Sequence, residues 1–327
     1  MRRSYWKSRI LTGIFLVLSS IGWGGNVLDL EANVRSRLET LGLHEGYDVQ
    51  RKRFIGIGSA TFTVKNPKKH QAILSARDSV YASAYLAARS ELMRAVRAVV
   101  SGESKLKVSG NEETGAAELK EEFRQGANVA LPGCVTLFAM ESLDDSEESN
   151  GAKVYSLALA VAWSGKLQRA VLKVRHEEFG APQDITEWKK FVQRNDLASM
   201  VGCRQFTGED GRLRWIGVGV YNGQNLAGPL LDSARSEATR AAERNLLFEL
   251  FCDGTATTVT EEMLLERDGG VGPTKLQHQR KMSDVVTNVC RGKSLHTRMV
   301  YAGILDCPMT GKKVFVCAIG IGPVDSE

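Results

Sequence analysis

Two glycine pairs in the sequence have a spacing that could hold a nucleotide. Gly56 and Gly58 lie two residues apart, and Gly217 and Gly219 repeat that spacing. A dinucleotide fingerprint needs a third glycine three residues after the second, where the backbone approaches the phosphates. The first pair has no third glycine, and the second has Gly223 one residue late. We therefore interpret the pairs as strand positions that another backbone approaches closely, and we predict no nucleotide or other cofactor.

An acidic run and five histidines are other groups that could bind a metal or catalyse a reaction. Residues 144–148 contain clustered carboxylates but lack the glycine and the ligand spacing of a calcium-binding loop. No two histidines have the i, i+4 spacing of a zinc-binding helix. Cys290 and His296 could form a nucleophile and a base, but spacing alone shows neither an orienting group nor an activated thiol. We predict no metal site and no catalytic residue. An enzyme whose catalytic residues lie far apart in the sequence is the least favoured alternative.

Six cysteines could form disulfides in an exported chain. None has the C-x-x-C spacing of a thioredoxin-like motif or a zinc knuckle. Cys252 and Cys290 flank one insertion, so we predict that these two form the bridge if one exists. Cys317 falls on an inward strand position, where a free thiol would be buried as a small apolar group.

Four aromatic residues lie in the connector between the two copies described below or directly after it. They are the candidate binding residues Trp188, Phe191, Phe206 and Trp215. Aromatic side chains that converge at a surface can line a groove for a peptide or a glycan. A junction between two domains must also bury apolar surface, and these residues could equally form that core. Both interpretations stay open.

The chain contains an internal duplication. Residues 54–58 read FIGIG and residues 215–219 read WIGVG, an offset of 161 residues. Residues 151–159 and 311–319 share a Gly-x-Lys-Val-aromatic pattern at an offset of 160. Two separate blocks at nearly one offset indicate a repeated unit.

Each copy predicts a strand, a long helix, a shorter helical piece and a hairpin, in that order. In the first copy these are residues 54–64, 71–100, 116–130 and 134–163, and in the second 213–221, 230–252, 274–290 and 294–321. A right-handed crossover would place the first strand beside the hairpin, giving a three-stranded sheet under the long helix. We predict an α+β fold of two tandem β-α-α-β-β repeats, packed as a pseudo-symmetric pair.

The N-terminus predicts a secretory signal peptide. Residues 1–24 have a basic start, an apolar run of twelve residues and small residues after it. Cleavage, retention as an anchor and the choice between general and twin-arginine export all stay open. The predicted division is a signal peptide at 1–24, an N-terminal helix at 25–50, repeat 1 at 51–175, a connector helix and hairpin at 176–212, and repeat 2 at 213–327.

Charge and hydropathy narrow the classes of partner. Removal of the leader with its four basic residues lowers the net charge from +5 to +1. A nearly neutral chain has no electrostatic basis for binding nucleic acid. No stretch after the leader is long and apolar enough to predict a transmembrane helix. We therefore expect a periplasmic or secreted protein.

The repeated pattern resembles small bacterial envelope domains. An aromatic-Ile-Gly-x-Gly strand, a helix rich in Ala and Arg, and a Gly-x-Lys-Val-aromatic strand are similar to the N-terminal domain of flagellar assembly protein T and to the lipoprotein-20 family. Residues 54–100 also resemble an uncharacterised secreted bacterial family with no assigned activity. The resemblance implies an envelope module used in assembly or binding, and it transfers no catalytic residue. No cysteine follows the apolar run of the leader, which departs from the lipoprotein members.

We expect an exported, non-catalytic envelope protein that binds or scaffolds another envelope component. The alternative is a binder of a small ligand or glycan at the interface of the two repeats. A bare strand edge or a flat apolar patch would favour the first reading. A polar pocket with convergent titratable groups at the junction would favour the second. The identity of the partner and the oligomeric state stay open.

Overall fold

The computed structural model describes most of the two repeats. It covers residues 27–48, 50–101, 131–145, 151–176, 181–221, 226, 228, 230–252 and 275–325. The predicted signal peptide, the predicted helical piece at 116–130 and residues 146–148 of the acidic run lie outside these ranges. Among the described helices, none combines the length and the apolar character needed to cross a membrane.

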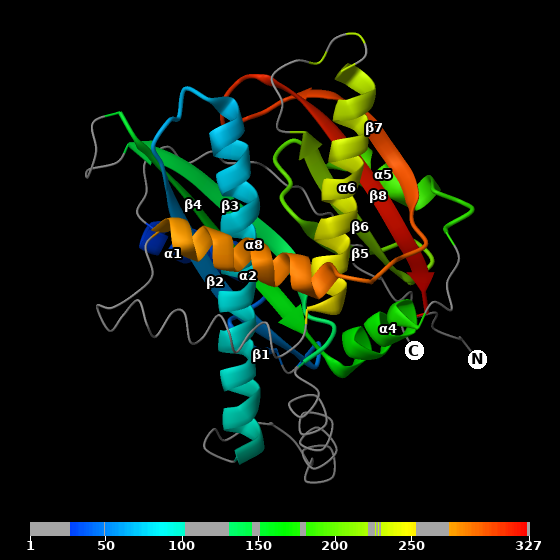
Figure 1. Cartoon of the computed structure of the whole chain (residues 1–327). Coiled ribbons are helices and arrows are strands. Elements are labelled where there is room, and N and C mark those ends of the chain that lie inside the picture. The colour runs from blue at the N-terminus through cyan, green and yellow to red at the C-terminus, as the bar shows by residue number, and fades with distance from the viewer. Residues whose placement is uncertain are drawn as a thin grey trace, which may run out of the picture.

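The fold is α+β and contains two antiparallel sheets of four strands each (Figure 1). The first sheet has the order β1-β2-β4-β3, with bounds β1 (Gly46–Asp48), β2 (Arg53–Val64), β3 (Val135–Asp145) and β4 (Lys153–Trp163). The second has the order β5-β6-β8-β7, with bounds β5 (Cys203–Thr207), β6 (Leu213–Tyr221), β7 (Arg298–Asp306) and β8 (Lys313–Val324). The same strand order in both sheets confirms the two-part arrangement expected from the duplication.

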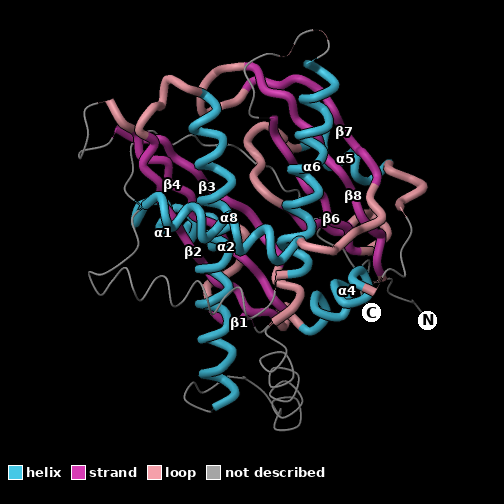
Figure 2. The backbone as a smooth tube through the Cα atoms, in the orientation of Figure 1, coloured by secondary structure: helices cyan, strands magenta, loops and turns pink. Residues whose placement is uncertain are grey.

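The helices cover the sheets and connect the two repeats. Their bounds are α1 (Val27–Thr40), α2 (His70–Ser101), α4 (Gly165–Arg175), α5 (Thr186–Arg194), α6 (Leu230–Phe251) and α8 (Lys275–Cys290). The long helices α2 and α6 pack on β2 and β6 respectively. Figure 2 shows α8 lying across both long helices, and α8 contacts each of them.

The first strand lies beside the hairpin as predicted, because β2 pairs with β4, but two other details of the predicted topology are wrong. β4 is buried on both faces over most of its length, so it takes the centre of the sheet. Its pairing with β2 is antiparallel, and no parallel crossover forms. Each sheet also gains a fourth strand, β1 from the predicted N-terminal segment and β5 from the connector hairpin.

The paired glycines lie where the long helices come closest to the sheets. A Cβ atom on Gly58 would lie 2.2 Å from the Ala88 nitrogen and 2.4 Å from the Ala84 oxygen of α2. A Cβ atom on Gly219 would lie 2.1 Å from the Ala238 oxygen of α6. Real Cβ atoms do not approach backbone atoms this closely, so only glycine fits. The interpretation of the glycines as close-approach positions is confirmed in both repeats.

The two repeats share one apolar core. One cluster of buried side chains contains Ile55 and Ala160 of the first sheet together with Ile319 of the second. Residues of α1 and α4 belong to the same cluster. α4 follows β4 after a Ser164 cap, whose hydroxyl accepts a hydrogen bond from the Leu167 amide. This continuous core holds the repeats together along their facing sides.

Replacing Gly58 with valine should destabilise the protein strongly. The added side chain would force α2 away from β2, and overpacking of this kind costs about 1–3 kcal/mol or more. Thermal unfolding should show a melting temperature several degrees below that of the parent protein. Thr61→Val is the matched control, because Thr61 is an exposed position of the same strand. An unchanged melting temperature for Gly58→Val would show that the close packing at Gly58 is wrong.

Candidate functional site

The two sheets meet edge to edge at β3 and β5. The carboxylate of Glu249, near the end of α6, accepts hydrogen bonds from the Thr136 amide at 2.7 Å and from the Tyr81 hydroxyl at 2.6 Å. The Tyr81 hydroxyl in turn accepts a hydrogen bond from the Cys203 amide of β5 at 3.4 Å. Glu249 is 1% exposed, and burial raises its pKa although these hydrogen bonds oppose the rise. The buried network fixes how one repeat sits against the other.

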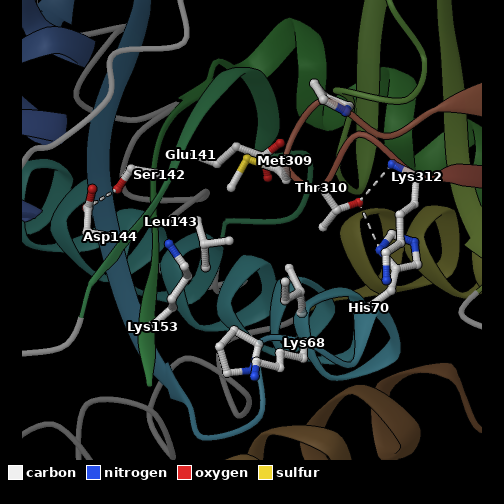
Figure 3. Close-up of a pocket in the computed structure, with 13 residues that line it drawn as sticks. Lys68, His70, Glu141, Ser142, Leu143, Asp144, Lys153, Met309, Thr310 and Lys312 are labelled. Atoms are coloured by element: carbon white, nitrogen blue, oxygen red, sulfur yellow. Dashed lines mark hydrogen bonds between the residues drawn. The ribbon is translucent and has the colours of Figure 1, made fainter. Parts of the chain in front are cut away.

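A cavity of about 260 Å³ lies between the repeats, and we call it the junction cavity (Figure 3). The first repeat contributes the start of α2 and the adjoining ends of β3 and β4, and the second contributes the turn between β7 and β8. Its lining residues are Pro67, Lys68, His70, Ile73, Glu141, Ser142, Leu143, Asp144, Lys153, Pro308, Met309, Thr310 and Lys312. Both repeats are therefore needed to form it.

His70 joins the two repeats at the wall of the junction cavity. Its Nδ1 lies 2.9 Å from the hydroxyl of Thr310, which comes from the β7–β8 turn. His70 is 2% exposed, and its Nε2 is buried with no hydrogen-bond partner in the described part of the chain. Burial lowers the pKa of His70, and the positive charge of Lys312 lowers it further. The imidazole is therefore neutral at neutral pH.

Positive charge gathers where α2 begins. Lys68 lies two residues before the helix, and the first turn of α2 contains no acidic residue. The N-terminus of a helix carries partial positive charge, and a cation there is unfavourable by about 0.3–1 kcal/mol. Among the described residues, neither Lys68 nor Lys312 has a carboxylate partner. Lys153, the third lysine of the cavity, pairs with Asp145 at 3.2 Å.

The carboxylates on the acidic side of the junction cavity accept hydrogen bonds from their own neighbours. Arg77 donates to both carboxylate oxygens of Glu141, at 2.8 and 2.9 Å. The Tyr155 hydroxyl also donates to Glu141. Asp144 accepts a hydrogen bond from the Ser142 hydroxyl at 2.9 Å. Glu141 is thus held in place and its charge is balanced by Arg77.

The structure does not bring the four connector aromatics together around a groove. Phe191 and Phe206 stack with ring centroids 4.6 Å apart, and Trp188 packs with them against the face of the second sheet opposite α6. The indole nitrogen of Trp188 donates to the Trp215 carbonyl at 3.0 Å. The Trp215 side chain points to the other face, in the core shared by both repeats. These aromatics are absent from the lining of the junction cavity, and their binding role stays a prediction.

The cysteines are unbonded. All six are free, so the bridge predicted between Cys252 and Cys290 is not formed in the structure. Burial raises the pKa of Cys290 to about 11, and a thiol that resists ionisation is a poor partner for oxidation. Cys252 and Cys317 are buried, and Cys317 has the inward position expected from the strand pattern. The thiols pack as small apolar groups.

The sequence places Asp144 in an acidic run and His70 among five histidines, but it does not bring them together at a cavity. His70 and Thr310 are 240 positions apart, so no local spacing reveals their contact. One signal was available, because two lysines directly before a long helix without an acidic first turn indicate unbalanced positive charge.

Comparisons with known proteins support the fold and leave the function open. A scan against models of protein families finds no match, and no curated protein matches the chain. A crystal structure of a hypothetical protein from Francisella tularensis is similar to this chain, with a TM-score of 0.55 and 14% sequence identity. The similarity covers 91% of this chain and 92% of that one. At this identity the likeness shows the shared fold alone.

Acidification should destabilise the protein in part through His70. Its pKa in the folded state lies below the ordinary value of 6.5, so the unfolded chain binds the proton more readily. Stability therefore falls as the pH drops below about 6.5. His70→Gln keeps a polar group beside Thr310 and removes the titration. Between about pH 8 and pH 5, the melting temperature of this variant should fall less than that of the parent, by about 1–3 °C.

The exposed His44 provides the control for this measurement. His44→Gln should retain the pH dependence of the parent protein. If His70→Gln and the parent lose the same stability on acidification, His70 is not the buried neutral group described above.

Proposed function

We propose that this protein binds a small ligand in the junction cavity. The observation that carries the proposal is the cavity itself, which both repeats line with apolar side chains and with lysine and hydroxyl groups. Small-molecule sites are usually concave and mostly apolar, with a few polar groups that orient the ligand.

The remaining walls of the cavity suit binding better than catalysis. Ile73, Leu143 and Met309 offer apolar surface, and the lysines and Thr310 offer polar contacts. This mixture of apolar lining and a few placed polar groups is typical of small-molecule sites. Glu141 has both oxygens engaged by Arg77, which leaves it held in place. We therefore propose a binding protein rather than an enzyme.

The position of the cavity gives binding a structural consequence. His70 belongs to the first repeat and Thr310 to the second, so a ligand between them would contact both repeats at once. Ligands that bind only the assembled state stabilise it. We propose that this occurs in the cell envelope, in line with the leader predicted at residues 1–24.

A filled cavity should abolish ligand binding. Leu143 is a half-buried residue of the cavity lining, and Leu143→Trp places a larger side chain in the space. Ligand-observed NMR with a mixed set of small carboxylates, phosphates, amines, alcohols and sugars should detect binding to the parent protein. The same compounds should lose binding to Leu143→Trp and keep it with Thr61→Trp, an exposed strand position of the first sheet. Compounds that bind the filled variant as well as the parent, or a set without binders, would contradict the proposal.

A second candidate function is the scaffolding of an envelope component. β7 is the outer strand of the second sheet, and Ile304 on it is 43% exposed. An outer strand of this kind can accept a strand from another protein. The resemblance of the repeats to envelope assembly modules supports the same role.

Crosslinking in cells tests the scaffold candidate. We expect a crosslinker followed by mass spectrometry to recover a second envelope protein, with linked peptides that include β7. Ile304→Lys should reduce that yield, because a charge on an outer strand opposes strand addition. Recovery of crosslinks within this protein alone would contradict the scaffold role.

A further inference from the structure

We infer that the ligand of the junction cavity is a small anion with a short apolar body, and that its charged head binds between Lys68 and Lys312 at the start of α2. This inference rests on the proposed function and adds the chemical class of the ligand. The shared chemistry is a carboxylate or a phosphate on a short hydrocarbon chain.

The first step is the balance of charge at the start of α2. Lys68 and Lys312 line the same cavity from different repeats. Neither has a carboxylate partner among the described residues, and the first turn of α2 offers no acidic side chain. The free amide groups of a helix N-terminus attract anions. Lys68 and Lys312 are exposed and bring positive charge to the cavity from both repeats.

The second step is the buried imidazole beside these lysines. His70 is the first residue of α2 and forms part of the cavity wall. Its Nδ1 contacts the Thr310 hydroxyl, and its Nε2 is buried and out of reach of a ligand. The neutral ring therefore adds no charge, and the lysines are the positive groups on this side of the cavity.

The third step is the arrangement of the carboxylates. Figure 3 shows Asp144 and Ser142 on the opposite side of the cavity from His70 and Lys312. Glu141 is balanced by Arg77. Asp144 thus lies on the opposite side of the cavity from Lys312. An anionic head beside His70 would avoid Asp144, whereas a cationic ligand would meet the positive side of the cavity.

The fourth step is the size and polarity of the remaining space. Ile73, Leu143 and Met309 line the cavity and would contact a hydrocarbon chain. The volume of about 260 Å³ admits a small molecule and excludes a polysaccharide or a two-chain lipid. A short amphiphile matches both the apolar surface and the positive end.

Isothermal titration with four compounds of one chain length tests the inference. The probes are hexanoate, hexyl phosphate, hexan-1-ol and hexylamine. Hexanoate or hexyl phosphate should bind at least about tenfold more tightly than hexan-1-ol, and hexylamine should bind most weakly. The ratio between the two anions identifies the head group. Added salt should weaken the anions and leave hexan-1-ol unchanged.

Removal of the two lysine charges provides the matched variant. Lys68→Gln with Lys312→Gln should weaken the preferred anion about tenfold or more and leave hexan-1-ol unchanged. Lys166→Gln with Lys189→Gln changes the net charge equally at exposed positions, and it should keep the affinity of the parent protein.

The outcomes separate this inference from the proposed function. If hexan-1-ol binds as tightly as the anions, or if the ligands found by NMR are neutral or cationic, the anion inference is wrong while the junction cavity remains a ligand site. If the anions bind equally to the parent and to Leu143→Trp, they do not occupy the cavity and both proposals fail. Anion binding that survives the loss of Lys68 and Lys312 overturns the assigned position of the head group.

Discussion

The buried carboxyl group of Glu249 is the contact on which the placement of the two repeats depends. It binds the backbone and side chain of Thr136 in one repeat while its own helix belongs to the other. Apolar packing alone is tolerant of small shifts, because it has no direction. Hydrogen bonds to a buried carboxyl group fix distance and angle, and leaving one unmade is costly. The network therefore selects one arrangement of the repeats from those that the shared core would permit.

The junction cavity follows from that arrangement. Its walls come from both repeats, so a small rotation between them would separate His70 from Thr310. A second tie between the repeats is the ion pair of Arg244 with Asp78, at 2.9 Å. α8 contacts both long helices and adds a third link. Several links between two bodies hold a gap between them at a constant shape, which is what a ligand site requires.

The duplication made the order and the bounds of the elements predictable, because the same order of sequence patterns occurs in both copies. β6 has the predicted limits, and α2 differs by one residue at each end. Strand neighbours were less predictable, because the alternating small and large residues of β4 fit either an outer or a central strand. The junction cavity was beyond prediction, since it depends on the approach of residues 240 positions apart. The connector aromatics were found by composition, but only the structure shows that they lie on opposite faces of one sheet.

Because β3 contacts β5, the two outer edges of the paired sheets are formed by different strands. The last strand of one sheet faces the first strand of the next, which is a heterologous contact rather than a two-fold one. Repetition of such a contact builds an open array instead of a closed ring. The two ends of this short array differ, since β1 spans three residues and β7 spans nine. The short edge strand β1 therefore offers little backbone for pairing with a further strand, whereas the longer edge strand β7 offers more.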